Sequence, residues 1–237
     1  MCMKNIKQQA LDYLSKNYLE NIDMIEPIRI DQVEFIYVDD DTVFFKEKRS
    51  GVYMINSDNI NKANEIILRV SDIQSIRTNL EEHLELLAEK FNLKETFRCK
   101  QCVYESVQEL PLSGKLDMKP LTLDHYQIIS ENYDLITNDD LRKHLENKEL
   151  FGGFVHDELV GFIGTHFEGS IGLLFVFPKH RKKGYASELE SFMINYLLSQ
   201  DLVPFAQVQI NNHSSFAVQK KLGMTIVEDT LFWAFNA

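Results

Sequence analysis

One short stretch limits most strongly what this chain can fold into. Residues 171–177, "IGLLFVF", are an apolar run of strand length, and the basic turn "PKHRKK" and Gly184 follow at once. From Gly184 to about Ser199 the apolar residues recur at helical spacing. A buried strand that leads through a glycine-containing turn into a helix predicts an α/β fold.

The same turn has the properties of an anion-binding site. The free N–H groups and the dipole at a helix start favour a bound anion. Gly184 lets the backbone approach a ligand closely, Ala186 adds no bulk, and Arg181, Lys182 and Lys183 add positive charge. A phosphate or pyrophosphate fits best, although the three cations taken alone could be a solvated surface run. The chain has neither a GxxxxGK[ST] loop nor a glycine-rich dinucleotide fingerprint.

The chain as a whole is acidic, which makes the basic turn a local exception. Its 237 residues carry a formal net charge of −11, so its field would repel phosphate polymers, and we expect neither nucleic acid nor membrane as a partner. At 44% hydrophobic and 26% charged residues, the composition is that of a soluble globular protein. Because no run has the length of a membrane span or the form of a signal peptide, a cytoplasmic location is expected.

The order of segments predicts two halves, 1–112 and 113–237, joined near Pro111 to Lys115. In the first half we expect an α+β domain: a helix to about Tyr18, the strands "VEFIYV", "VFFKEK" and "GVYMIN", two amphipathic helices, and a strand with two cysteines. In the second half we expect strands at 118–121, 151–156, 159–167, 171–177, 204–210 and 225–235, and helices at 124–133, 138–147, 184–199 and 214–222. The predicted fold class is therefore α/β (α+β), with a mixed sheet.

Two groups of residues invite a metal interpretation that the sequence does not support. Cys99 and Cys102 lack a second pair of ligands and are interpreted as structural thiols. The run Asp39 to Asp41 lacks the glycine and the later glutamate of a calcium loop, and we expect a solvated hairpin tip there. No metal site is predicted.

A second motif gives the basic turn a context. In "NHSSFAVQKKLGM", Asn212 and Ser215 match N-x-x-S, and Lys221 and Gly223 match K-x-G-F with Met224 in the place of Phe. Together with R-x-x-G-x-A in the basic turn, this half resembles the GNAT superfamily of acyl-CoA-dependent N-acyltransferases. The passages "GSIGLLFVFPKHRKKGYA" and "PFAQVQINNHSS" are most similar to its glycine-N-acyltransferase-like branch.

The resemblance covers about half the chain, from Met118 onward. The first half has a similar order of segments but neither motif. We interpret it as a degenerate copy of the same GNAT-like fold without a cofactor; the alternative is an unrelated regulatory or dimerising unit, so a homodimer stays open.

The resemblance implies a site for acetyl-CoA or another acyl-CoA as co-substrate. The amides from Lys182 to Ala186 would hold the pyrophosphate, and backbone groups near Leu174 and Val176 would pair with the pantetheine. Tyr185 would pack on the helix or cover the cofactor. Asn212 and Ser215 would lie near the thiol end, where Ser215 is also a candidate for the catalytic set.

The base and the acid are less well defined by the resemblance. Related enzymes are thought to use a carboxylate at the position of Ser170. Glu168, two residues earlier and on the same face if the strand continues that far, is our candidate base, although it could be a plain turn residue. His166 is a second candidate. Gln219 stands where the family often has a tyrosine acid.

Two functions follow from these expectations. The first is transfer of an acyl group, preferably acetyl, to a primary amine of a small molecule or amino acid. The alternative is a non-catalytic acyl-CoA-binding sensor or interaction module, which Gln219 in place of tyrosine would suit.

Overall fold

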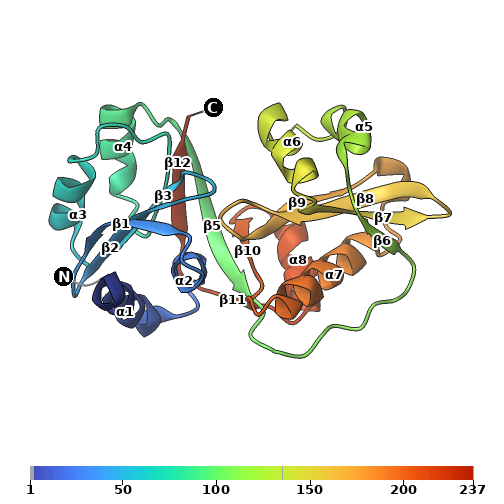
Figure 1. Cartoon of the computed structure of the whole chain (residues 1–237), viewed down its shortest axis with the longest axis horizontal. Helices are drawn as coiled ribbons and strands as arrows, with labels where there is room; N and C mark the ends of the chain where they lie inside the picture. The colour runs from blue at the N-terminus through green and yellow to red at the C-terminus, as the bar shows by residue number, and fades with distance from the viewer. Residues whose placement is uncertain (1–2, 135, 237) are drawn as a thin grey trace.

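The computed structural model describes residues 3–134 and 136–236 as a mixed α/β structure with one sheet running through it (Figure 1). The elements of the first half are α1 (Met3–Leu14), η1 (Ser15–Asn17), α2 (Ile22–Arg29), β1 (Val33–Val38), β2 (Thr42–Glu47), β3 (Tyr53–Ser57), α3 (Ile60–Ile67), β4 (Ser75–Thr78), α4 (His83–Phe91) and β5 (Glu95–Val103). Those of the second half are β6 (Asp117–Pro120), η2 (Leu123–His125), α5 (Tyr126–Ser130), α6 (Asn138–Glu146), β7 (Leu150–Val155), β8 (Glu158–Thr165), β9 (Ile171–Val176), η3 (Pro178–His180), α7 (Tyr185–Ser199), β10 (Phe205–Gln209), α8 (His213–Lys221), β11 (Thr225–Ile226) and β12 (Leu231–Phe235). The fold class predicted from the sequence is confirmed.

The strands follow the order β1-β2-β3-β4-β12-β5-β10-β9-β8-β7-β6, and β11 pairs with β5 outside this path. β3 runs parallel to β4, and β9 runs parallel to β10. The two halves therefore repeat one arrangement: β1-β2-β3-α3-β4-α4 in the first and β7-β8-β9-α7-β10-α8 in the second. This repetition agrees with the interpretation of the first half as a copy of the second.

The last strand of each half lies in the sheet of the other half. β5 pairs antiparallel with β10, from Val103 opposite Phe205 to Cys99 opposite Gln209. β12 lies between β4 and β5, where Trp233 is opposite both Arg77 and Phe97. The predicted division between residues 112 and 113 falls in the linker from β5 to β6 and stays a prediction, while the sheet continues across both halves (Figure 1).

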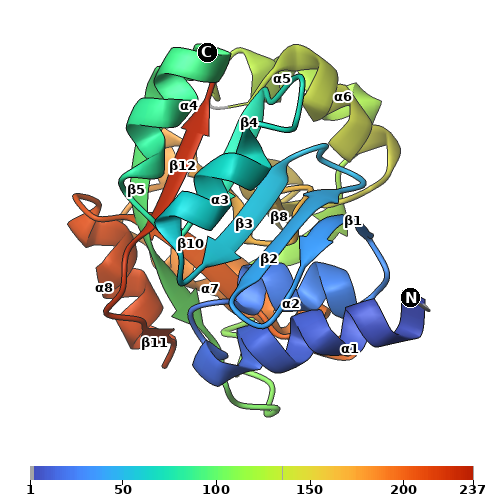
Figure 2. The same ribbon diagram turned by 90° about the vertical axis from the view of Figure 1, so that its left-hand side faces the viewer.

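Helices cover both faces of the sheet in each half. In the first half, α1 and α2 pack on one face of β1 to β3, and α3 and α4 pack on the other (Figure 2). In the second half, α7 packs through Leu189 and Met193 against residues such as Val160, and α5 and α6 pack around Phe162. The alternation of buried side chains along the strands explains this, because successive residues face opposite layers.

One helix is not expected from the sequence. α2 contains Pro27 near its end, and proline normally argues against a helix interior. The helix forms because Met24, Ile25 and Ile28 are buried against the sheet, so tertiary packing outweighs local preference. The first predicted helix is also shorter than expected, since α1 ends at Leu14 and a 3-10 turn continues to Asn17. None of the helices described is both long and apolar enough to span a lipid bilayer.

Candidate active site

The basic turn between β9 and α7 has the geometry of an anion cradle. Lys182 and Gly184 have left-handed backbone, with φ of +62° and +86°, and Gly184 is the N-cap of α7. Among the turn and loop hydrogen bonds of the described residues, none is donated by the amides of Lys182, Lys183 or Gly184. These N–H groups and the helix dipole are therefore available to a ligand. The residues from Arg181 to Gly184 are exposed.

Gly184 leaves room that a side chain would occupy. A Cβ added there would lie 3.8 Å from the Nζ of Lys115, which belongs to the linker between the halves. The linker is held at this place by the buried carboxylate of Glu188, which accepts hydrogen bonds from the backbone N–H of Lys115 at 2.9 Å and of Leu116 at 3.3 Å, and from the hydroxyl of Ser113. An exposed lysine in a linker gives no sequence pattern, so Lys115 is not predicted from the sequence.

The other predicted residues of the turn are partly engaged with the protein itself. The Nε of Arg181 donates to the carbonyl of Val176 at 3.1 Å, so this guanidinium folds back on the strand end. Tyr185 is half-buried and packs against the core beneath α7, which is one of the two positions expected for it. Ala186 lies next to it in the first turn of α7.

β9 and β10 separate from each other toward the cradle. Within the described residues they pair at a single position, Ile171 opposite Ala206. Past that point β9 contains a bulge where it pairs with β8. Between two successive pairs of these strands, β8 has one residue, whereas β9 has two, Leu173 and Leu174. Leu173 has a left-handed backbone, with φ of +51°. The β9 edge that carries Leu174 and Val176 thus faces a wedge rather than a paired strand.

The second sequence motif forms the start of α8. The Oδ1 of Asn212 accepts from the backbone N–H of Ser215 at 3.1 Å and from the hydroxyl of Ser214 at 2.9 Å. Asn212 is thus a helix N-cap, which is one physical reason for asparagine at this position. Asn212 and His213 are exposed, Ser215 is half-buried, and their roles at a thiol end stay a prediction.

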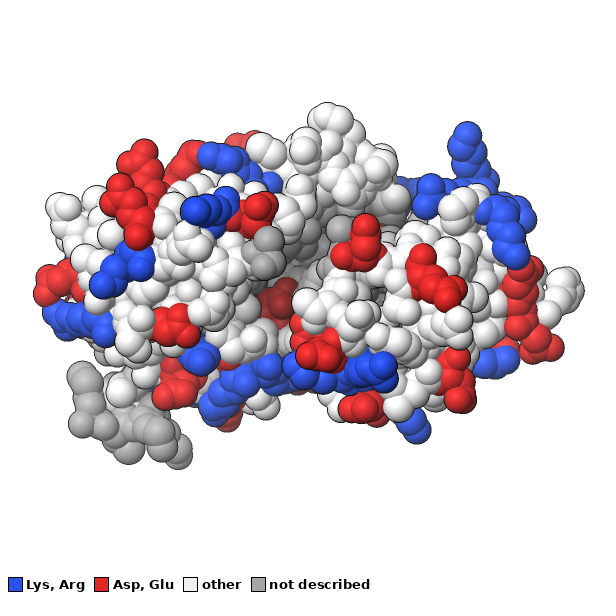
Figure 3. Space-filling model, turned by 90° about the horizontal axis from the view of Figure 1, so that it is seen from above, with Lys and Arg blue, Asp and Glu red and all other residues white. Residues whose placement is uncertain are grey.

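A cleft of about 730 Å³ lies between the two halves of the molecule. Figure 3 looks down into it and shows a hollow with mostly uncharged walls and acidic atoms at its floor. Its lining residues come from β5, β10, β12, the turn before β9 and the segment between α5 and α6: Phe97, Cys99, Tyr133, Asp134, Ile136, Thr137, His166, Glu168, Ser170, Gln207, Gln209, Trp233, Phe235 and Asn236. Burial raises the pKa of Tyr133 to about 12, so its phenol stays protonated and is a hydrogen-bond donor.

Both candidate bases lie in this cleft. Glu168 is half-buried in the turn between β8 and β9, and its Oε1 accepts from the hydroxyl of Ser170 at 2.7 Å. The imidazole of His166 covers Gly172, because a Cβ at residue 172 would lie 2.3 Å from its Nε2. The absence of a side chain at Gly172 is therefore what lets His166 occupy its position. No sequence pattern predicts this pairing.

A buried polar network fixes the floor of the cleft. Arg77 makes a bidentate ion pair with Asp23, at 2.8 and 3.0 Å, and both side chains are almost fully buried. Gln207 donates to Asp23 at 3.0 Å and accepts from the indole N–H of Trp233 at 2.7 Å. The network joins α2, β4, β10 and β12, so the orientation of Trp233 depends on elements of both halves.

Gln219 does not face the cleft. Its side chain is 2% exposed and donates to Glu190 of α7 in the core between the two helices. Burial raises the pKa of Glu190 to about 7, although the hydrogen bond from Gln219 opposes this change. Gln219 is thus part of the packing between α7 and α8. None of the described residues that line the cleft is a tyrosine from α8.

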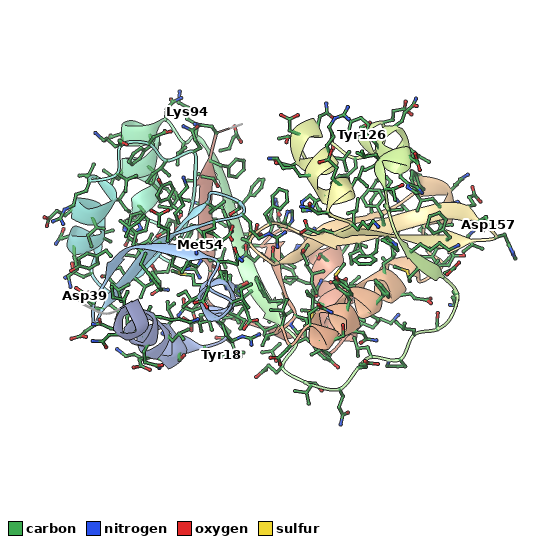
Figure 4. All side chains as sticks on the ribbon, viewed as in Figure 1. Tyr18, Asp39, Met54, Lys94, Tyr126 and Asp157 are labelled. Atoms are coloured by element: carbon green, nitrogen blue, oxygen red, sulfur yellow. The ribbon has the colours of Figure 1, made fainter. Side chains whose placement is uncertain are left out.

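The groups considered as metal ligands are two buried thiols and a pair of carboxylates that bind a lysine. Cys99 and Cys102 are free and buried on β5, and burial raises the pKa of each thiol to about 12. Asp39 and Asp41 both bind Lys62, at 2.9 and 2.6 Å. Figure 4 labels Asp39, which lies at the outer end of the first half, far from the cleft.

Part of this sequence matches a known family, and the fold is similar to that of several solved structures. Residues 117–224 match the model of the acetyltransferase (GNAT) family. None of the curated proteins matches the chain significantly. A solved Drosophila protein superimposes with a TM-score of 0.69 at 13% identity, covering 100% of this chain and 97% of that one. A GCN5-related N-acetyltransferase-like protein from Streptococcus suis 89/1591 gives 0.58 at 15%, covering 99% and 100%. A tandem GNAT protein from the clavulanic acid biosynthesis pathway gives 0.51 at 13%, covering 98% and 95%.

The structural likeness at these identities concerns the fold. The chain contains a GNAT acetyltransferase domain at residues 117–224, and it shares its fold with a tandem GNAT protein over nearly its whole length.

Proposed function

We propose that the protein is an N-acyltransferase that moves the acetyl group of acetyl-CoA to a primary amine of a small molecule. The observation that carries this proposal is the position of the wedge. It opens at the cradle before α7, and its closed end, where Ile171 pairs with Ala206, lies beside the turn that carries Glu168. β9 therefore begins beside the cleft that contains Glu168 and ends at the anion site before α7.

The length of β9 sets the distance between the closed end of the wedge and the anion site. β9 has six residues and spans about 20 Å at about 3.3 Å per residue. The backbone amides of Lys182 to Ala186, with Lys115 beside Gly184, would bind the pyrophosphate. Leu174 and Val176 offer backbone groups to the amide-containing pantetheine, although the carbonyl of Val176 already accepts from Arg181.

Glu168 is the proposed base. An amine that binds as a cation first releases one proton to solvent; the neutral nitrogen then attacks the thioester carbonyl carbon, the new C–N bond forms, and the C–S bond breaks. Glu168, held by the hydroxyl of Ser170, takes the proton that the nitrogen loses. The thiolate leaves without a strong acid, since the ordinary pKa of a thiol is about 8.5. This is consistent with Gln219 being buried outside the cleft.

Two variants test the proposal. Gly184→Val would place a side chain in the cradle and should abolish saturable acetyl-CoA binding in calorimetry, while Gly223→Val, at another left-handed glycine with open space around it, controls for backbone strain. Glu168→Gln should lower kcat by at least about 100-fold, and Asp134→Asn removes a second carboxylate from the same cleft as its control. Turnover unchanged in Glu168→Gln would remove the assigned base.

A second candidate function is acyl-CoA binding without turnover. Its specific support is that the position of the usual tyrosine acid holds Gln219, directed into the core. Saturable acetyl-CoA binding with no acetylation of any amine would favour it. The glycine-N-acyltransferase-like branch stays a prediction, and an amino-acid acceptor is the alternative to the carboxylate-free acceptor that is proposed below.

A further inference from the structure

The charges along the cleft limit what its second substrate can be. Asp134 and Glu168 are the carboxylates of its wall, and none of the described residues that line it is a lysine or an arginine. Arg77 lies near the floor, but Asp23 binds it in a bidentate pair. Arg98 is on β5 next to Phe97, points to the opposite face of the sheet, and pairs with Glu81. A ligand carboxylate would therefore meet like charge with no lysine or arginine among the described lining residues to pair with.

The opposite wall is aromatic, and its residues lie on β5 of the first half and on β12, the last strand of the second half. Phe97 of β5 and Phe235 of β12 have ring centroids 4.8 Å apart at 64°, and Trp233 lies opposite Phe97 in the same sheet face. Phe97 is 41% exposed, an unusual state for a large apolar side chain on an inner strand. Tyr133 faces the cleft from the other side.

The polar group of the aromatic wall is already satisfied. The indole N–H of Trp233 donates to Gln207, whose amide donates to Asp23. What this wall offers an occupant is consequently ring surface, which suits a flat apolar body. The face of an aromatic ring also attracts cations and does not favour anions.

The two walls together define an orientation. The carboxylate of Glu168 and the imidazole of His166 lie near the closed end of the wedge, where an amine is needed. Phe97 and Phe235 belong to β5 and β12, on the other side of β10, where the body of the acceptor would extend. A volume of about 730 Å³ is within the usual range for a small-molecule site of roughly 300–1,000 Å³.

We propose that the acceptor is a cationic primary amine on an aromatic body that carries no carboxylate. This inference rests on the proposed function for the transfer step, but it concerns the cleft and can be tested by binding alone. The surface that selects the acceptor then comes from β5 of the first half, which has no cofactor motif, together with β12 of the second half.

Binding can be followed without turnover, because Trp233 is the only tryptophan in the chain and lines the cleft. The probes are phenethylamine, tyramine and 1-naphthylmethylamine, with phenylalanine and tyrosine as the carboxylate-bearing counterparts of the first two. We expect saturable changes in Trp233 fluorescence with the amines and at least tenfold weaker binding of each amino acid. In acetyl-CoA assays, kcat/KM should be at least tenfold higher for each amine than for its amino acid.

A matched pair of variants locates the effect. Phe97→Ala should weaken amine binding at least fivefold, whereas Ile36→Ala, an equally exposed apolar residue at 41% on β1, should leave it unchanged. Equal binding of amines and amino acids, no binding of any of the three amines, or no effect of Phe97→Ala in a folded protein would overturn the inference.

The outcomes also separate this inference from the function on which it rests. Amine binding that depends on Phe97, with no acetylation of any amine, would support the acceptor site and refute the transferase. Acetylation of amino acids or of aliphatic amines in preference to the aromatic amines would support the transferase and refute the acceptor class.

Discussion

The carboxyl of Glu190 gives the most direct test of the packing between α7 and α8. Its side chain is 2% exposed, and the amide of Gln219 donates to its Oε1. Its Oε2 and the Oε1 of Gln219 are both buried without a hydrogen-bond partner. When Glu190 is protonated, its O–H is a hydrogen-bond donor at a place where both side chains otherwise present only unpaired acceptor oxygens. The substitution Glu190→Gln supplies an N–H donor there at every pH.

The size of the effect follows from the pKa of this carboxyl. Burial raises it from the ordinary value of 4.5 to about 7. Below pH 4.5 the carboxyl is protonated in both states; between pH 4.5 and 7 the unfolded chain releases the proton and the folded chain keeps it. The free energy of unfolding therefore falls as pH rises through this interval, by about 1.4 kcal/mol per pH unit and about 3 kcal/mol in all.

Urea denaturation at several values from pH 4.5 to 8 measures this contribution. Wild type and Glu190→Gln should have similar free energies of unfolding at pH 4.5, and the variant should be more stable by about 3 kcal/mol above pH 7. Glu34→Gln, at an exposed position on β1, controls for the loss of one carboxyl group. A difference between wild type and Glu190→Gln that stays constant over this range would refute the reasoning.

Three further variants test other parts of the structure. Asp23→Asn breaks the buried ion pair under the cleft and should lower the free energy of unfolding by about 3–5 kcal/mol in urea; a loss below 1 kcal/mol would contradict this. Lys115→Ala should raise the Kd for acetyl-CoA about threefold at low salt and less at high salt, measured by calorimetry with Lys94→Ala as the distant control; equal effects of the two would exclude Lys115 from the cradle. Gly172→Ala should displace the ring of His166 and raise the KM for the amine while the midpoint of unfolding changes little, and an unchanged KM would show that this ring does not contact the acceptor.

The sequence predicts most helices and strands because the patterns that define them are local. The run "IGLLFVF", the basic turn and the helix after it occur as β9, a left-handed turn and α7. α2 is the exception, since the local effect of Pro27 is opposed by burial that only the tertiary structure supplies. The position of β12 between β4 and β5 could not be predicted, because the alternation in "LFWAF" fits a strand beside any partner.

For the candidate site, the sequence indicates the basic turn and two candidate bases but not the aromatic wall of the cleft. Glu168 lines the cleft as the candidate base should. Phe97 and Trp233 carry no functional signal, because aromatic residues in strands are most often core residues. Gln219 has a functional interpretation from its motif position, yet the fold gives it a packing role against Glu190, and burial of this kind is not visible in spacing alone.

The exchange of β5 and β12 has a consequence for how the protein is made. While the ribosome synthesises the chain, β4 emerges early, but the neighbour that completes its hydrogen bonds, residues 231–235, emerges more than 150 residues later. Until residues 231–235 have been synthesised, the first half has an open strand edge beside β4. Its final folding is thus tied to that of the second half, and a chain that stops before β12 would lack a strand in the domain that was synthesised first.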